Sequence, residues 1–124
     1  MEFVEFVERV ESRIQNPQPG EAERAVIATF ETLGERVSGG EASDIAAQLP
    51  EELQGPLRRA SGNPEGFGLE GFFRRVAEKE GVDINKATDH ATAVMKVLSE
   101  AISSGELSDV RSQLPREFYP LLQG

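Results

Sequence analysis

The sequence predicts an all-α protein, a helical bundle built by internal duplication with about four helices in each half. Apolar residues recur at the three- and four-residue spacing of amphipathic helices, and no segment sustains the alternation typical of a strand. In addition, the phrase Gly-Glu-x-x-Asp-x-x-x-Gln-Leu-Pro occurs at Gly40–Pro50 and again at Gly105–Pro115. A chain of 124 residues is long enough for one domain with a buried core.

Two helices are expected before the first copy of this phrase. Five apolar residues of the N-terminal segment share one helical face, namely Phe3, Phe6, Val7, Val10 and Ile14. The proline- and glycine-rich stretch 16–20 should break this helix. A second helix is then expected from about Glu21 to Val37, and Gly39 and Gly40 are expected to end it.

The repeated phrase itself is interpreted as a structural corner between two short helices. A helix is expected over Glu41–Gln48, and Pro50 is suited to the first position of the next one. The amides of Gln48 and Gln113 are expected to bond to backbone at this junction. The motif positions are Gly40, Asp44, Gln48, Leu49, Pro50, Gly105, Asp109, Gln113, Leu114 and Pro115.

The second half follows the same order as the first. We expect a helix after residue 68, a long helix capped by Asp83 or Asn85, a break at Gly105, and a last helix starting at Pro115. Residues 22–57 and 87–122 align without a gap, with identity at about 14 of 36 positions. We therefore expect a single domain, 1–124, with repeats 1–60 and 67–124 and a linker at 61–66.

Composition excludes several classes of function. The chain has no cysteine, so disulfides, thiolate metal sites and cysteine catalysis are excluded. The formal net charge of −9 repels phosphate and anionic lipid, so neither nucleic acid nor a membrane is expected as a partner. The acidic N-terminus lacks the continuous apolar run of a secretory signal, which favours a cytoplasmic location.

The chemistry-bearing residues do not form a known catalytic pattern. His90 is the only histidine, and because it aligns with Ala25 it is expected to have a surface or filler role. Ser43 and Ser108 are expected to bond to backbone N–H groups near helix starts. The paired carboxylates, Glu41 with Glu106 and Asp44 with Asp109, could do acid–base work or hold a hard cation, but because they lie at expected helix ends they are expected to serve helix termini. We expect no enzyme activity, no metal and no cofactor.

Four arginines flank the loop between the two halves, and they allow an alternative hypothesis. Arg58, Arg59, Arg74 and Arg75 could form a basic patch that contacts an acidic partner or an anion in a pocket between the repeats. They could equally pair with the many glutamates across helix faces.

Three stretches carry a resemblance to a known family: AERAVIATFETLGERVSGGEASDIAAQLPEEL, GFFRRVAEKEGV and AISSGELSDVRSQLPREF. Together they resemble the family called domain of unknown function 2267 over essentially the whole chain. The resemblance implies a small, all-helical prokaryotic protein of two tandem repeats, and it implies no activity, cofactor or catalytic residue. Gly68 departs from the acidic helix cap that related sequences tend to carry there, which implies a weaker helix start.

From the residues, the leading hypothesis is a non-enzymatic helical module that binds a protein partner or a second copy of itself. The alternative is a small-ligand or anion-binding protein with a pocket between the repeats.

Overall fold

The computed structural model describes residues 1–59 and 63–123, and these residues form helices and no strand. The all-α fold class is therefore confirmed. Residues 61 and 62 of the expected linker, and residues 60 and 124 at the ends of the expected repeats, lie outside the described residues. The helices are α1 (Phe3–Ser12), α2 (Glu21–Arg36), α3 (Gly39–Ala47), α4 (Glu51–Arg59), α5 (Leu69–Glu80), α6 (Ile84–Ala101), α7 (Ser104–Ser112) and the 3₁₀ helix η1 (Arg116–Leu122).

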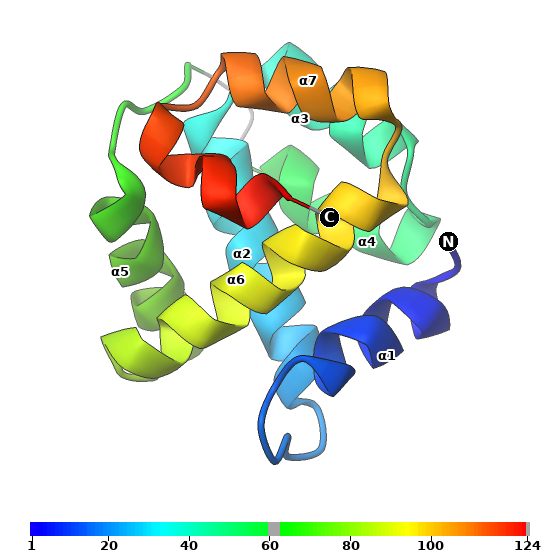
Figure 1. Ribbon diagram of the computed structural model, residues 1–124, viewed down its shortest axis with the longest axis vertical. Helices are drawn as coiled ribbons and strands as arrows, with labels where there is room; N and C mark the ends of the chain where they lie inside the picture. Colours follow the sequence, from blue (N-terminus) through cyan, green and yellow to red (C-terminus); the bar gives the residue numbers. More distant parts are fainter. Residues whose placement is uncertain (60–62, 124) are drawn as a thin grey trace.

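The two longest helices, α2 and α6, pack against each other in the centre of the molecule (Figure 1). Between them they contact α1, α3, α4, α5 and η1, while α7 packs on α3 and η1. One hydrophobic cluster contains buried side chains from every helix, including Phe6 of α1, Phe30 of α2, Phe72 of α5 and Phe118 of η1. Both halves of the chain thus share one core. None of the described helices combines the length and the apolar character needed to cross a lipid bilayer.

Each short helix begins immediately after a long one. Val37 and Ile102 are extended residues that end α2 and α6, and the next residue in each case is a serine N-cap. Ser38 Oγ accepts the N–H of Glu41, and Ser103 Oγ accepts the N–H of Glu106, both at 3.1 Å. Serine is a preferred N-cap because its oxygen satisfies a donor that the helix leaves free.

These serines correct two expectations about helix ends. Gly39, Gly40 and Gly105 do not end the long helices, because they lie in the first turns of α3 and α7. The preceding extended residue ends each long helix instead. Elsewhere the expected cap is confirmed for Asp83, whose side chain accepts the N–H of Lys86.

Gln48 and Gln113 connect the ends of the two short helices to each other. Gln48 Oε1 accepts the backbone N–H of Ser103 at 2.7 Å, and its Nε2 lies 3.3 Å from Ser103 Oγ. Gln113 makes the same two contacts with Ser38, at 2.8 and 3.2 Å. The expected amide-to-backbone bond is confirmed, but its partner is the start of the opposite short helix rather than the local corner.

The last helix differs in type from the others. Arg116–Leu122 is a 3₁₀ helix, whereas the sequence predicted a helix like α4. Pro120 lies inside it and provides no N–H. The carbonyl of Leu122 accepts a bond from Arg111 of α7, so the end of the chain is tied to the preceding helix.

Gly34 allows a close approach of α2 and α4. A Cβ atom added to Gly34 would lie 2.6 Å from the carbonyl oxygen of Leu57, closer than nonbonded atoms can approach. The Cβ atom is attached directly to the backbone of α2, and the oxygen belongs to the backbone of α4. Neither atom can therefore move aside as the end of a flexible side chain would. The packing of α4 on α2 therefore requires glycine at this position.

We expect Gly34→Ala to lower the free energy of unfolding by about 1–3 kcal/mol, since the added methyl forces the two helices apart. This loss should outweigh the gain of up to about 1 kcal/mol that alanine brings to a helix interior. Gly40→Ala in α3 is the matched control, because a Cβ atom there would meet no atom within 4 Å and the change should leave stability unchanged or raise it. Urea denaturation of both variants would contradict the packing argument if the two changes had the same effect.

Candidate functional site

α3 and α7 lie side by side in opposite directions, so that the start of each is bonded to the end of the other, and each carries a buried glutamate in its first turn. Glu41 and Glu106 are each three residues beyond the capping serine. A glutamate at this position commonly folds back to accept the N–H of the capping residue. Here the glutamine of the opposite helix accepts that N–H, as described above for Ser38 and Ser103. The two glutamate side chains are therefore not used as caps.

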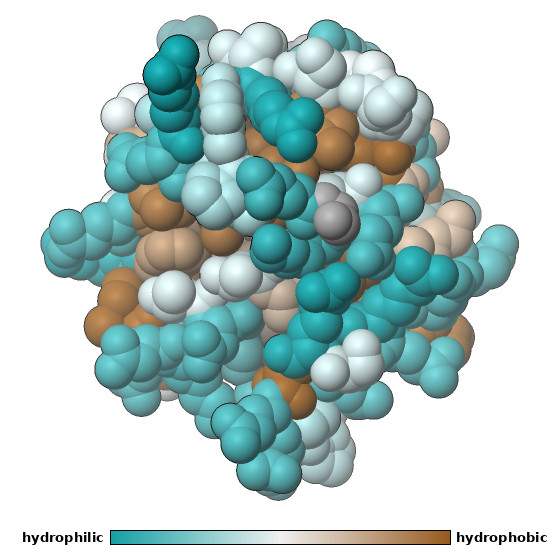
Figure 2. Space-filling view, in the orientation of Figure 1, coloured by the Kyte–Doolittle hydropathy of each residue, from teal (hydrophilic) through white to brown (hydrophobic). Residues whose placement is uncertain are grey.

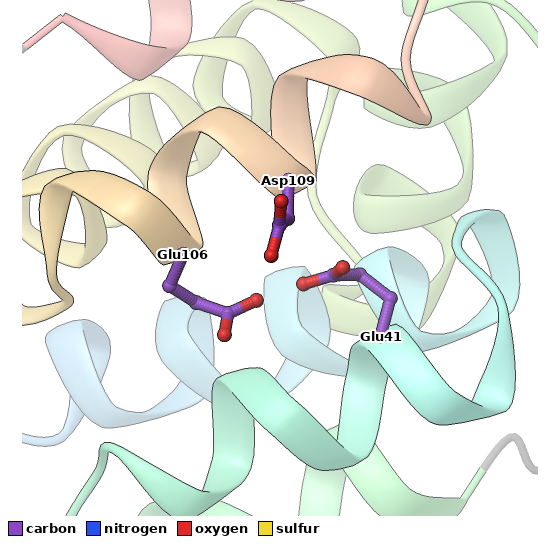
Figure 3. Close-up of side chains that lie close together, drawn as sticks. All are labelled: Glu41, Glu106 and Asp109. Atoms are coloured by element: carbon purple, nitrogen blue, oxygen red, sulfur yellow. The ribbon is translucent and has the colours of Figure 1, made fainter.

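Glu41 and Glu106, which are not used as caps, form a carboxylate cluster with Asp109 (Figure 3). One oxygen from each residue can be chosen so that all three lie within 4.8 Å of one another. Glu41 is 6% exposed and Glu106 is 8% exposed, whereas Asp109 faces solvent. The Oε2 atoms of Glu41 and Glu106 are buried and have no hydrogen-bond partner in residues 1–59 and 63–123. The repeated phrase aligns Glu41 with Glu106, but only the fold brings them together.

Crowding of negative charge alters the acidity of this cluster. The pKa of Glu41 is raised from 4.5 to about 8, first by burial and then by contact with the Glu106 carboxyl and by the charges of Glu106, Asp109 and Asp44. Because ionisation is disfavoured in the folded state, this group lowers the free energy of unfolding progressively as pH rises from 4.5 to about 8. Near neutral pH the cluster therefore favours an added positive charge, either a proton or a cation.

A second group of buried charges surrounds His90, which is 1% exposed. Its Nδ1 lies 2.7 Å from Glu80 Oε1, and its Nε2 lies 2.7 Å from Glu21 Oε2. These contacts join α6 to α5 and α2. Of the two roles expected for His90, surface or filler, the surface role is excluded, because its position on α6 faces the core, like the aligned Ala25 on α2.

The two carboxylates stabilise the charged imidazolium, since each ring nitrogen then donates to one of them. The pKa of His90 is raised, first by the contact with Glu80 and then by Glu21, with burial opposing both. The pKa of Glu21 is lowered, chiefly by the Gln18 backbone N–H and then by His90. Because its nitrogens point in opposite directions, His90 cannot bring Glu21 and Glu80 onto a single metal ion.

Two of the four arginines lie beside the same helix. Arg59 pairs with Glu31 of α2, and Arg75 pairs at 3.1 Å with Glu35, one turn further along. Lys79 also contacts Glu35, at 3.0 Å. Each of these three positive charges is therefore paired with a glutamate, and an anion would have to displace the glutamates.

The other two arginines have separate local contacts. Arg74 pairs with Glu70 on its own helix, and Arg58 donates to Ser43 Oγ at 2.7 Å. The contacts do not place Arg58 and Arg74 together. They also correct the expectation for Ser43, whose hydroxyl accepts from Arg58 while Ser38 caps the helix.

The sequence matches a known protein family over most of its length. The family model described as Uncharacterized conserved protein (DUF2267) matches residues 3–121. A comparison with curated proteins gave no match.

The contacts of His90 predict a pH-dependent stability that a single substitution should reveal. His90→Gln should lower the free energy of unfolding by about 3 kcal/mol near pH 6, because it leaves buried carboxylates without their cation. A histidine pKa that is raised in the folded state contributes stability that is fully present below pH 6.5 and is lost as pH rises through the folded-state pKa. The difference in free energy of unfolding between wild type and His90→Gln should therefore narrow at higher pH. The charged groups facing His90 are Glu80 of α5 and Glu21 of α2, and Lys86 of α6 lies 3.9 Å from Glu21.

The measurement is a series of urea denaturations between about pH 5 and pH 9. The contribution of Glu41 is common to both proteins and cancels in the difference. Asp89→Asn, an exposed change on the same helix, should follow the wild-type curve. A wild-type advantage that stayed constant over this range would show that His90 is not charged in the folded state.

Proposed function

The chain belongs to the DUF2267 family of uncharacterised conserved proteins, and we propose that it is a non-enzymatic helical module that binds a protein partner through α1. The single observation behind this proposal is an apolar face on α1 that is wider than the core covers. The proposal concerns this surface and does not depend on the carboxylate cluster.

The apolar residues of α1 span an arc of about 160° on an ideal helix. Phe6 and Val10 at one side of the arc are fully buried in the core. Phe3 and Val7 are half-buried, and Val4 at the other side is 64% exposed. We call Phe3, Val4 and Val7 the α1 stripe. Apolar surface is visible beside the first turn of α1 at the right-hand edge of Figure 2.

Charge around the α1 stripe indicates the chemistry of the partner. Four glutamates lie on α1 or at its N-cap, and among the described residues only Glu5 forms an ion pair, with Arg9; the four are Glu2, Glu5, Glu8 and Glu11. A second copy of this chain would bring a net charge of −9 against the same acidic surface. An apolar segment flanked by lysine or arginine complements the stripe better, since opposite charges favour encounter and register.

The proposal that the module is not an enzyme is supported by the state of its histidine. A general base must reach the proton that it removes. His90 is buried, and both of its nitrogens face carboxylates, so it reaches no serine hydroxyl among the described residues.

We also propose that the two halves arose by internal duplication. This is supported by the gapless alignment, by short helices that begin at Gly39 and Ser104, and by the reciprocal contacts of Gln48 and Gln113. The 3₁₀ form of η1, whose counterpart α4 is an α-helix, and His90, which aligns with Ala25, then reflect later divergence of the two halves.

Val4→Asp should weaken binding of a labelled amphipathic leucine–lysine helical peptide about fivefold, because it removes roughly 1 kcal/mol of apolar contact. The same substitution adds a negative charge, which by itself would strengthen binding of a basic peptide. A loss of affinity therefore reports on the apolar contact. The measurement is fluorescence anisotropy at about 0.15 M salt.

Ile27→Asp is the matched control, since Ile27 is 43% exposed on α2 and the change adds the same charge elsewhere. Equal affinity of the two variants would argue against the α1 stripe. Sedimentation of the chain alone tests the other occupant: a dimer that Val4→Asp converts to a monomer would show that the partner is a second copy.

A further inference from the structure

The carboxylate cluster of Glu41, Glu106 and Asp109 has more negative charge than its surroundings neutralise. The ion pairs formed by the described residues involve other carboxylates, namely Glu5, Glu21, Glu31, Glu35, Glu65, Glu70, Glu80 and Glu100. Removing a carboxylate from water without a partner is costly, and a second carboxylate beside it adds repulsion. The cluster therefore needs a positive occupant that the described side chains do not supply.

The orientation of the buried oxygens provides independent support for a ligand. Glu41 and Glu106 are each more than nine-tenths buried, and within the part of the chain that the structure describes the Oε2 atom of each has no hydrogen-bond partner. Figure 3 shows the Glu41 side chain reaching from α3 toward those of Glu106 and Asp109 on α7. Since the capping serines are bonded to Gln48 and Gln113, the two glutamates are not needed to complete the helix starts.

We propose that Glu41, Glu106 and Asp109 bind one hard divalent cation of the size of calcium, which links α3 to α7. Carboxylate oxygens with no nitrogen or sulfur ligand are the donor set of Ca²⁺, Mg²⁺ and Mn²⁺ rather than of zinc. Three evenly spaced oxygens at a calcium distance of about 2.4 Å from one ion are about 4.2 Å apart, so oxygens within 4.8 Å of one another need at most a small inward movement to share it. Magnesium, with bonds of about 2.0–2.1 Å, would require a larger inward movement. Asp109 is exposed, so water can complete the coordination and the ion has a route of entry.

The test is thermal unfolding of the full chain after treatment with a chelator, at constant ionic strength and near-neutral pH. About 1 mM CaCl₂ should raise the Tm of the wild type by about 5 °C, and titration calorimetry should give one ion per chain. The same concentration of MgCl₂ should raise it less. An equal shift with both ions would overturn the assignment of a calcium-sized site.

Two variants distinguish this site from general binding to an acidic protein. Glu106→Gln keeps the shape of the side chain but removes one ligand charge, and it should abolish the calcium shift. Without calcium it should melt at or above the wild-type Tm because repulsion is relieved, which shows that the fold is intact. Glu78→Gln, an exposed change on α5 that alters net charge equally, should retain the full shift.

The remaining outcomes overturn the proposal. If calcium shifts the wild type and Glu106→Gln equally, the ion binds elsewhere. If calcium shifts neither protein, a shared proton rather than a cation occupies the cluster. Both outcomes leave the α1 stripe untouched, so failure here is separate from failure of the proposed function.

Discussion

Packing of α2 against α6 is the contact on which the positions of the other helices depend. Only two residues, Val37 and Ser38, separate α2 from α3, and only Ile102 and Ser103 separate α6 from α7. Each pair includes an extended residue that reverses the chain without a flexible loop. Once the long helices are packed, such short connections leave the two short helices little freedom. They therefore lie side by side on the core in opposite directions, with the start of each beside the end of the other.

An exchange of hydrogen-bond partners follows from this placement. Each short helix has a sequence that could cap itself, with serine at the cap and glutamate three residues later. The glutamine of the other short helix accepts the N–H of the capping serine in place of the glutamate, so helix capping becomes a contact between the two halves of the chain. The exchange removes the usual role of Glu41 and Glu106 and leaves them buried with their charges facing. An ordinary local motif is in this way converted into a site that a positively charged ligand would stabilise.

The fold class and most helices could be predicted because their signals are local. Apolar spacing, the break at residues 16–20 and the corner at Leu49–Pro50 each depend on neighbours in sequence. Glycines misled the prediction of two helix ends, because Gly39 and Gly105 can follow a cap as readily as end a helix. The serine at the cap was a better signal.

The candidate site was less predictable because it depends on residues far apart in the chain. Glu41 and Glu106 could be paired by alignment, but their distance is set by the packing of α2 on α6. The partners of His90 illustrate the same limit, since Glu21 is 69 positions away and no local pattern connects them. The excess apolar width of α1 was visible in sequence, yet only burial shows that Val4 lies outside the core.

The large sequence separation between Glu21 and His90 also has a kinetic consequence. Bringing Glu21 to His90 closes a loop of more than half the chain, and the entropy of closing it must be overcome before the contact contributes. Because Glu21 lies on α2 and His90 on α6, we expect this contact to form only once the two long helices have docked. Interactions absent from the folding transition state act mainly on the unfolding rate. We therefore expect the buried charges around His90 to prolong the lifetime of the folded state more than they speed folding.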